Sequence, residues 1–382
     1  MKKLILFISI FISFYSGLWA QCQNKVSSDA PGERVNNRLR PGNARYGNPY
    51  TMFKMDSKDF DYTSALNQIR INIKNGAPKS ENTPFQNDYA NLYHQLFVAA
   101  TDFNEPAVCP HLQENEDCTH PQWVKNNAII YLVGLKYQVN SNNIGEFVEM
   151  NDSIRNYYAE RAYTGLKNLN PKIESCWSGA GEGCDFLRNK APQLVQYLQA
   201  YDLLKTGGKI AHYADDNSSD DCNPRNKLRQ FASNMYKFSD AIINSSNGWK
   251  KNSGIICASA IGMAAIVLND AGSTKRSFKP KNWFNRANGI PGGEDNILML
   301  IGWGEDGIED NFFIGDHGPF AEDVPQSSPD GKSGYAEGPD YFHYTCRVFL
   351  PYLRALDNYL PDDNLNNFLK QERYKNILLW SD

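Results

Sequence analysis

Residues 252–269 read NSGIICASAIGMAAIVLN, and beyond the first three residues this run offers almost no polar face. A surface helix would show a polar stripe opposite its apolar one, and none is present here. A helix that is apolar all round must be buried on all sides. The sequence therefore predicts that residues 252–269 form an inner helix, enclosed by other elements.

Helical patterns dominate the chain around this run. Apolar residues recur at helical spacing, and we expect further helices over residues 91–103, 122–138, 145–168, 191–205, 226–244, 341–360 and 363–380. Strand signals are few. A buried inner set and an amphipathic outer set of antiparallel helix pairs describe an all-α (α/α) toroid, an incomplete helical barrel with long irregular loops. A globular helical bundle is the alternative.

The N-terminus predicts export. Two lysines and an apolar run that ends near Trp19 make residues 1–20 a signal peptide, and the run is too short to favour a membrane span. Cleavage near Ala20 is favoured over lipid attachment at Cys22, because the usual pair of small residues does not precede Cys22. We expect a periplasmic or secreted protein without a membrane span, with an irregular lead-in over residues 21–85 and the toroid over residues 86–382.

The amino-acid composition limits which kinds of molecule the protein is expected to bind. The net charge of −4 and the isoelectric point near 5.9 argue against general nucleic-acid binding. Aromatic residues make up 13% of the 382 residues, among them 21 tyrosines. Such a surplus in an exported protein is compatible with carbohydrate handling, because sugar faces stack on rings. Oligomeric state is left open by the sequence.

The eight cysteines of an exported chain suggest disulfides. Two pairs bracket short loops and are expected to staple them, Cys109 with Cys118 and Cys176 with Cys184. Cys257 and Cys346 fall in predicted helices and are expected to be small buried hydrophobes.

No metal and no cofactor are predicted. A zinc site made of Cys109, His111, Cys118 and His120 has no familiar spacing and is less favoured than the disulfide. The acidic loop 305–310 lacks the alternation of a calcium-binding loop, so a hydrated surface loop is favoured there. No role is assigned to the four histidines that lack convincing partners in the sequence, which are His94, His111, His120 and His212.

Two helix starts carry groups suited to proton transfer. Residues 330–344 read DGKSGYAEGPDYFHY, a glycine-rich loop that leads into a helix with tyrosines, a carboxylate and an imidazole. About eighty residues upstream, residues 249–256 read WKKNSGII, which places an asparagine beside two lysines at the start of the apolar helix. An amide, cations and phenols are the groups needed to act on an acidic sugar.

Together these stretches resemble the heparinase II/III-like and alginate-lyase-like polysaccharide lyases. Asn252 at the start of a small-residue helix resembles their Asn-containing helix, and residues 330–344 resemble their Asp-Gly, Glu-Gly-Pro and Tyr segment. Residues 191–204 resemble a helix that comes earlier in the same toroid. The likeness covers roughly residues 90–360 and is moderately specific.

The resemblance implies cleavage of a uronic-acid polysaccharide by β-elimination. Asn252 would neutralise the sugar carboxylate and Tyr344 would act as base and acid. His343 and Glu337 are further catalytic candidates. The candidates for contact with the anionic substrate are Tyr335, Tyr341, Lys250, Lys251 and Arg347. In many relatives a histidine follows the asparagine directly, whereas Ser253 stands there in this chain.

Two other functions stay open. An (α/α) glycoside hydrolase acting on uronyl oligosaccharides would need two carboxylates across a cleft, which Glu337 with Asp306, Asp310 or Asp316 could offer. A non-catalytic glycan-binding protein would fit the serine at position 253. Helix capping is an ordinary use of asparagine at a helix start, and a glutamate is favourable there for electrostatic reasons alone.

Overall fold

The computed structural model describes residues 62–101, 104–108, 119–173, 187–210, 223–243, 252–268 and 339–359. Helices predominate in these ranges, with one two-stranded sheet. The helices are α2 (Tyr62–Asn75), α3 (Asp88–Thr101), α4 (His120–Val133), α5 (Asp152–Asn168), α6 (Leu187–Thr206), α7 (Pro224–Ile243), α8 (Asn252–Val267) and α11 (Pro339–Tyr359). The strands are β1 (Leu135–Val139) and β2 (Gly145–Glu149).

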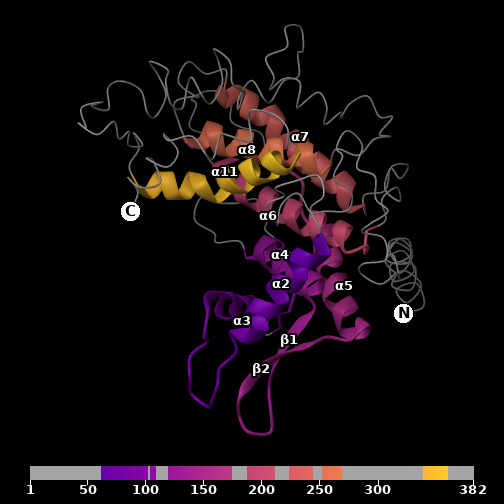
Figure 1. Ribbon diagram of the computed structural model, residues 1–382. Coiled ribbons are helices and arrows are strands. Elements are labelled where there is room, and N and C mark those ends of the chain that lie inside the picture. Colours follow the sequence, from indigo (N-terminus) through magenta and orange to yellow (C-terminus); the bar gives the residue numbers. More distant parts are fainter. Residues whose placement is uncertain are drawn as a thin grey trace, which may run out of the picture.

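The elements stack along one direction (Figure 1). Figure 1 shows α7, α8 and α11 at one end, the β1–β2 hairpin at the other, and α4, α5 and α6 between them. Helix α6 is central, because it packs against α4, α5, α7, α8 and α11. None of the helices in the described ranges has the length and hydropathy of a transmembrane span.

The apolar helix α8 is buried as predicted. Every side chain of α8 that the structure describes is buried, from Ile256 to Val267. Its neighbours are α6, α7 and α11. Cys257 is buried in this core and forms no disulfide, which confirms the interpretation of that residue as a small hydrophobe. Cys346 on α11 forms no disulfide either and is half-buried. Burial raises the pKa of the Cys346 thiol to about 11.

Helices α4 and α6 run in the same direction. His120 at the start of α4 bonds Tyr197 near the middle of α6, at 2.6 Å. Tyr131 near the end of α4 donates to the carbonyl oxygen of Gly207, just beyond the end of α6, also at 2.6 Å. Neighbouring inner helices of a toroid also run in parallel, but parallel neighbours occur in other helical folds as well. The largely helical fold is confirmed, and the toroid stays a prediction.

The C-terminal end of α4 is held by two arginines. Arg70 of α2 donates to the carbonyl oxygen of Val133 at 2.6 Å, and Arg155 of α5 donates to that of Tyr131 at 3.3 Å. Cations are favourable where the last carbonyl groups of a helix lack partners. Arg155 lies near the start of α5, so this contact sets α5 antiparallel to α4.

The hairpin is the clearest departure from the predicted helices. Residues 122–138 were expected to be one helix and residues 145–168 another, but α4 ends at Val133 and α5 begins at Asp152. Gly134 adopts φ 68°, a left-handed conformation that ends α4. Strand β1 then pairs antiparallel with β2, with Leu135 opposite Glu149 and Val139 opposite Gly145. The strictly all-α prediction is therefore wrong for residues 135–149.

The turn of the hairpin is made by asparagines. The side chain of Asn140 accepts hydrogen bonds from the backbone of Asn142 and Ile144, and Asn143 has φ 57°. Asparagine tolerates this conformation and bonds locally to the backbone, so it favours turns over helix. A second correction concerns residues 21–85, since residues 62–75 of that predicted irregular segment form helix α2.

Replacing Gly134 with alanine should lower the free energy of unfolding by about 1–2 kcal/mol, because an L residue is strained in the left-handed region. A Cβ at this position would also lie 2.8 Å from Nε of Arg155. Urea unfolding of Gly134→Ala and Gly134→Asn measures the strain. Both variants carry the Cβ, but asparagine tolerates the conformation better, so equal losses would contradict a backbone cause.

Candidate functional site

Helices α8 and α11 carry the two halves of the predicted site and pack against each other. Asn252 is the first residue of α8, as expected, and α11 begins at Pro339 within the predicted 330–344 stretch. Helix α6, which contains the third stretch of the resemblance, contacts both of them. Three segments that are far apart in the sequence therefore meet in one packed group.

Tyr344 is the predicted catalytic residue that the structure describes best. It lies half-buried on α11 and packs against the apolar core. Its hydroxyl donates a hydrogen bond to Oδ1 of Asn189, at 3.0 Å. Asn189 lies at the start of α6 and was not singled out in the sequence. The only local signal for it is its place two residues before Ala191, where the motif of α6 begins.

The other predicted site residues are described in part or not at all. His343 and Arg347 are exposed on α11, on either side of Tyr344 in the sequence. Asn252 and Tyr341 belong to α8 and α11, but their side chains lie outside the described residues. Four more candidates lie wholly outside them, namely Tyr335, Glu337, Lys250 and Lys251. Convergence of Asn252 and Tyr344 on one cleft stays a prediction.

Sequence reasoning missed a buried polar network at the start of α4. His120 is fully buried and uses both ring nitrogens. Nδ1 lies 2.6 Å from the hydroxyl of Tyr197, and Nε2 lies 3.2 Å from Oε1 of Glu105. Asn168 at the end of α5 donates to the same carboxylate oxygen at 2.9 Å. The network thus joins α4, α5, α6 and the 104–108 segment.

The electrostatics of this network favour a structural role. The hydrogen bond from His120 holds the pKa of Glu105 below its usual range, with a further hydrogen bond from Asn168. Burial raises the pKa of Tyr197, and the charge of Glu105 adds to that effect. A general base needs a pKa near the working pH, so Tyr197 is poorly placed to remove a proton. The network fixes helices in place.

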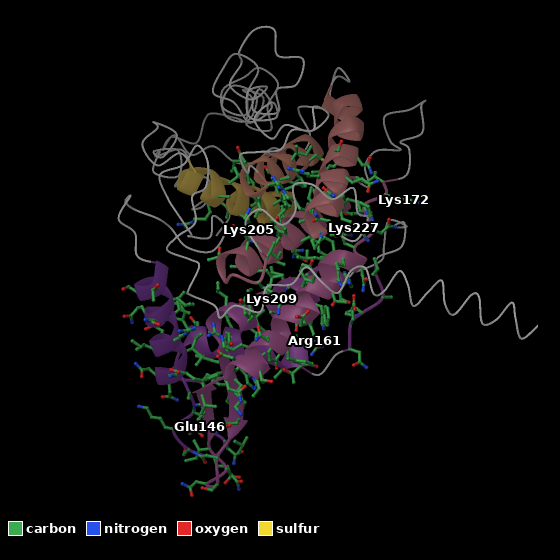
Figure 2. The ribbon with its side chains drawn as sticks, turned by 90° about the vertical axis from the view of Figure 1, so that its right-hand side faces the viewer. Glu146, Arg161, Lys172, Lys205, Lys209 and Lys227 are labelled. Carbon is green, nitrogen blue, oxygen red and sulfur yellow. The ribbon has the colours of Figure 1, made fainter. Side chains whose placement is uncertain are left out.

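Basic side chains gather on the part of the molecule formed by α5, α6 and α7. Figure 2 shows there the labelled residues Arg161, Lys172, Lys205, Lys209 and Lys227, with Glu146 away on the hairpin. Lys209 pairs with Glu160 at 2.8 Å, and Lys227 donates to the carbonyl oxygen of Leu169 at 3.3 Å. Because these lysines already bind groups of the protein, they serve packing first.

Arg161 lies between two aromatic rings. Its guanidinium carbon is 4.9 Å from the ring centre of Trp123 and 5.2 Å from that of Tyr157. It also donates to the Tyr157 hydroxyl at 3.1 Å. Cation–π contacts of this kind stabilise a helix surface, and Tyr157 and Arg161 are one turn apart on α5.

The zinc and disulfide predictions fall mostly on residues outside the described ranges, which include Cys109, His111, Cys118, Cys176 and Cys184. The same is true of His212 and of the acidic loop 305–310. His120 is described, and both of its ring nitrogens are occupied by protein partners. Within the described ranges, no group of three or more His, Cys, Asp or Glu side chains is arranged to hold a metal ion.

Comparison with known proteins adds no assignment to this geometry: no protein-family model matches the chain, and no curated protein is significantly similar to it.

Proposed function

We propose that this chain is an exported polysaccharide lyase that cleaves a uronic-acid-containing glycan by β-elimination. The observation that carries the proposal is the hydrogen bond between Tyr344 and Asn189, 3.0 Å long, where α11 meets α6. A half-buried phenol held by an amide is a suitable proton-transfer group. Helix α8, which begins at Asn252, packs against both α6 and α11.

The chemistry assigns one task to each group. The amide of Asn252 donates to the substrate carboxylate and stabilises the enolate-like state that forms when the neighbouring carbon loses its proton. Tyr344, as phenolate, takes that proton. The electron pair of the broken C–H bond forms a C=C bond, the glycosidic C–O bond breaks, and the leaving oxygen receives a proton from the Tyr344 phenol.

The remaining candidates complete the proposal. His343 or Glu337 would relay protons, in place of the histidine that relatives carry where this chain has Ser253. Contact with an anionic polymer would come from Arg347 and His343, which are exposed on α11, and from the substrate candidates Tyr335, Tyr341, Lys250 and Lys251. The predicted signal peptide would bring the enzyme to polymers outside the cytoplasm.

The test is a panel of polymers. Purified mature protein is incubated with alginate, heparan sulfate, chondroitin sulfate, hyaluronan and pectin, and absorbance is followed at about 232 nm, where the unsaturated uronate formed by elimination absorbs. Asn252→Ala is assayed beside the unaltered protein. We expect one polymer to give a rise in absorbance, and Asn252→Ala to suppress it.

The same panel separates the other functions. New reducing ends without a rise in absorbance would identify a hydrolase and sink the lyase proposal. A flat trace with retained binding of a polymer, unchanged in Tyr344→Phe, would identify a glycan-binding protein instead.

A further inference from the structure

We propose that Asn189 is the positioning residue for Tyr344, holding the phenol as a neutral acid and stabilising it as a phenolate base. This inference rests on the proposed lyase function for its catalytic meaning. It concerns a residue that the resemblance does not include, and it follows from a single described contact between α6 and α11.

The geometry fixes both partners. Asn189 is partly buried in the first turn of α6, and Tyr344 is partly buried in the second turn of α11. The phenol O–H donates to Oδ1 across 3.0 Å. The next residue on each helix is nearly or fully buried, Lys190 at 4% exposed and Thr345 at 1%. Tyr344 also packs against the apolar core, which limits how far its ring can turn away from Asn189.

An amide suits a group that changes its charge during turnover. The carbonyl oxygen of Asn189 accepts from the phenol, and the NH₂ group on the same carbon can donate to a phenolate after a half-turn of the amide. Tyr344 first loses its phenol proton to solvent, then takes the proton of the sugar carbon and passes it to the leaving oxygen. Asn189 exchanges no proton in these steps and offers a partner to both forms.

The helices that meet at Tyr344 carry both signs of charge in their sequences, with Arg188 and Lys190 beside Asn189 on α6, and with Asp340, His343, Cys346 and Arg347 near Tyr344 on α11. On α6, Lys190 follows Asn189 and is buried. On α11, His343 and Arg347 flank Tyr344 and are exposed. Cys257 is the one titratable side chain in the sequence of α8. Because the side chain at position 189 bonds the phenol directly, a negative charge introduced there should be felt strongly by a phenolate at Tyr344.

The experiment compares Asn189→Asp, Asn189→Ala and Asn189→Gln. Tyrosines labelled with ¹³C at Cζ are followed by NMR as pH rises, and the Tyr344 signal is assigned by its loss in Tyr344→Phe. An aspartate cannot donate to the phenolate and repels it, so Asn189→Asp should move the Tyr344 titration midpoint upwards by about one pH unit. Asn91→Asp, the same change at an exposed site on α3, is the control and should leave the midpoint in place.

Kinetics give the second readout. On the polymer that is cleaved, Asn189→Ala should lower kcat about 100-fold with little change in KM, because it disturbs the base and not the bound sugar. Asn189→Gln, which keeps the amide, should recover part of this loss. A midpoint and a kcat that are both indifferent to these substitutions would overturn the inference.

The two proposals fail in different ways. If no polymer is cleaved, the lyase function fails, while the NMR titration still reports whether Asn189 controls Tyr344. If a polymer is cleaved and Tyr344→Phe is inactive, but the Asn189 variants behave like the unaltered protein, the lyase function stands and the role of Asn189 is rejected.

Discussion

Replacing Tyr344 with phenylalanine should lower kcat/KM on the cleaved polymer by about 10³-fold, within the range found when a general acid or base is removed. The substitution takes away one oxygen atom and leaves the ring that packs against the core. It also removes the hydrogen bond to Asn189, which should cost only about 1 kcal/mol of stability because the site is partly exposed. A large loss of rate with a small loss of stability separates catalysis from folding.

The control is Tyr89→Phe, since Tyr89 is 55% exposed on α3, an element that does not pack against α11. Initial rates of absorbance increase, measured over a range of polymer concentrations, give kcat/KM for both variants, and urea unfolding gives their stability. Retention of more than about a tenth of the activity in Tyr344→Phe would remove Tyr344 from the role of base.

The helices could be predicted where the sequence pattern is strong. The predicted bounds of α6, α7, α8 and α11 fall within about four residues of the observed ones, because apolar spacing and the glycine or proline near their ends carry the signal. The helix predicted over residues 191–205 would place Pro192 in its first turn, where proline is favourable, but α6 begins earlier, at Leu187.

The hairpin and α2 were missed for different reasons. Leu135 and Tyr137 continue a run of apolar residues that suits a helix. The end of α4 therefore depends on Gly134 alone, and a single glycine within such a run is a weak signal for a helix end. In α2, Leu66, Ile69 and Ile73 do follow helical spacing, and two of them are buried. The polar residues around these three make the stripe hard to recognise in the sequence, and in the structure α2 packs against α3, α4 and β2.

The site was predictable only where it is local in sequence. Tyr344 stands out in an aromatic segment, whereas its partner Asn189 is 155 residues away. The same holds for His120, whose partners Glu105 and Tyr197 are 15 and 77 residues distant. Such pairs arise from the way α4, α6 and α11 pack, and the spacing of residues within a single helix does not predict them.

Removing one partner from the buried pair of His120 and Tyr197 should be among the most destabilising changes in this part of the molecule. His120→Leu keeps most of the side-chain volume but leaves the hydroxyl of Tyr197, which is only 2% exposed, without its bond to the imidazole. It also takes one hydrogen bond from Glu105, which keeps Asn168. A buried polar group deprived of its partner costs about 1–3 kcal/mol, so with the lost packing we expect about 3 kcal/mol.

The double variant decides whether this cost comes from the hydrogen bond. Tyr197→Phe alone leaves Nδ1 of His120 without its hydrogen-bond partner. His120→Leu and Tyr197→Phe together remove both polar groups of the pair, so neither is left unsatisfied. The loss in the double variant should therefore fall short of the sum of the two single losses by about 1–2 kcal/mol, as expected for residues in contact. Urea unfolding of all four proteins gives this difference. His94→Leu, which removes a half-buried ring that contacts Phe85 at a tilt and Tyr137 edge-on, is the matched control for losing an imidazole. Strict additivity would show that His120 and Tyr197 contribute through packing alone.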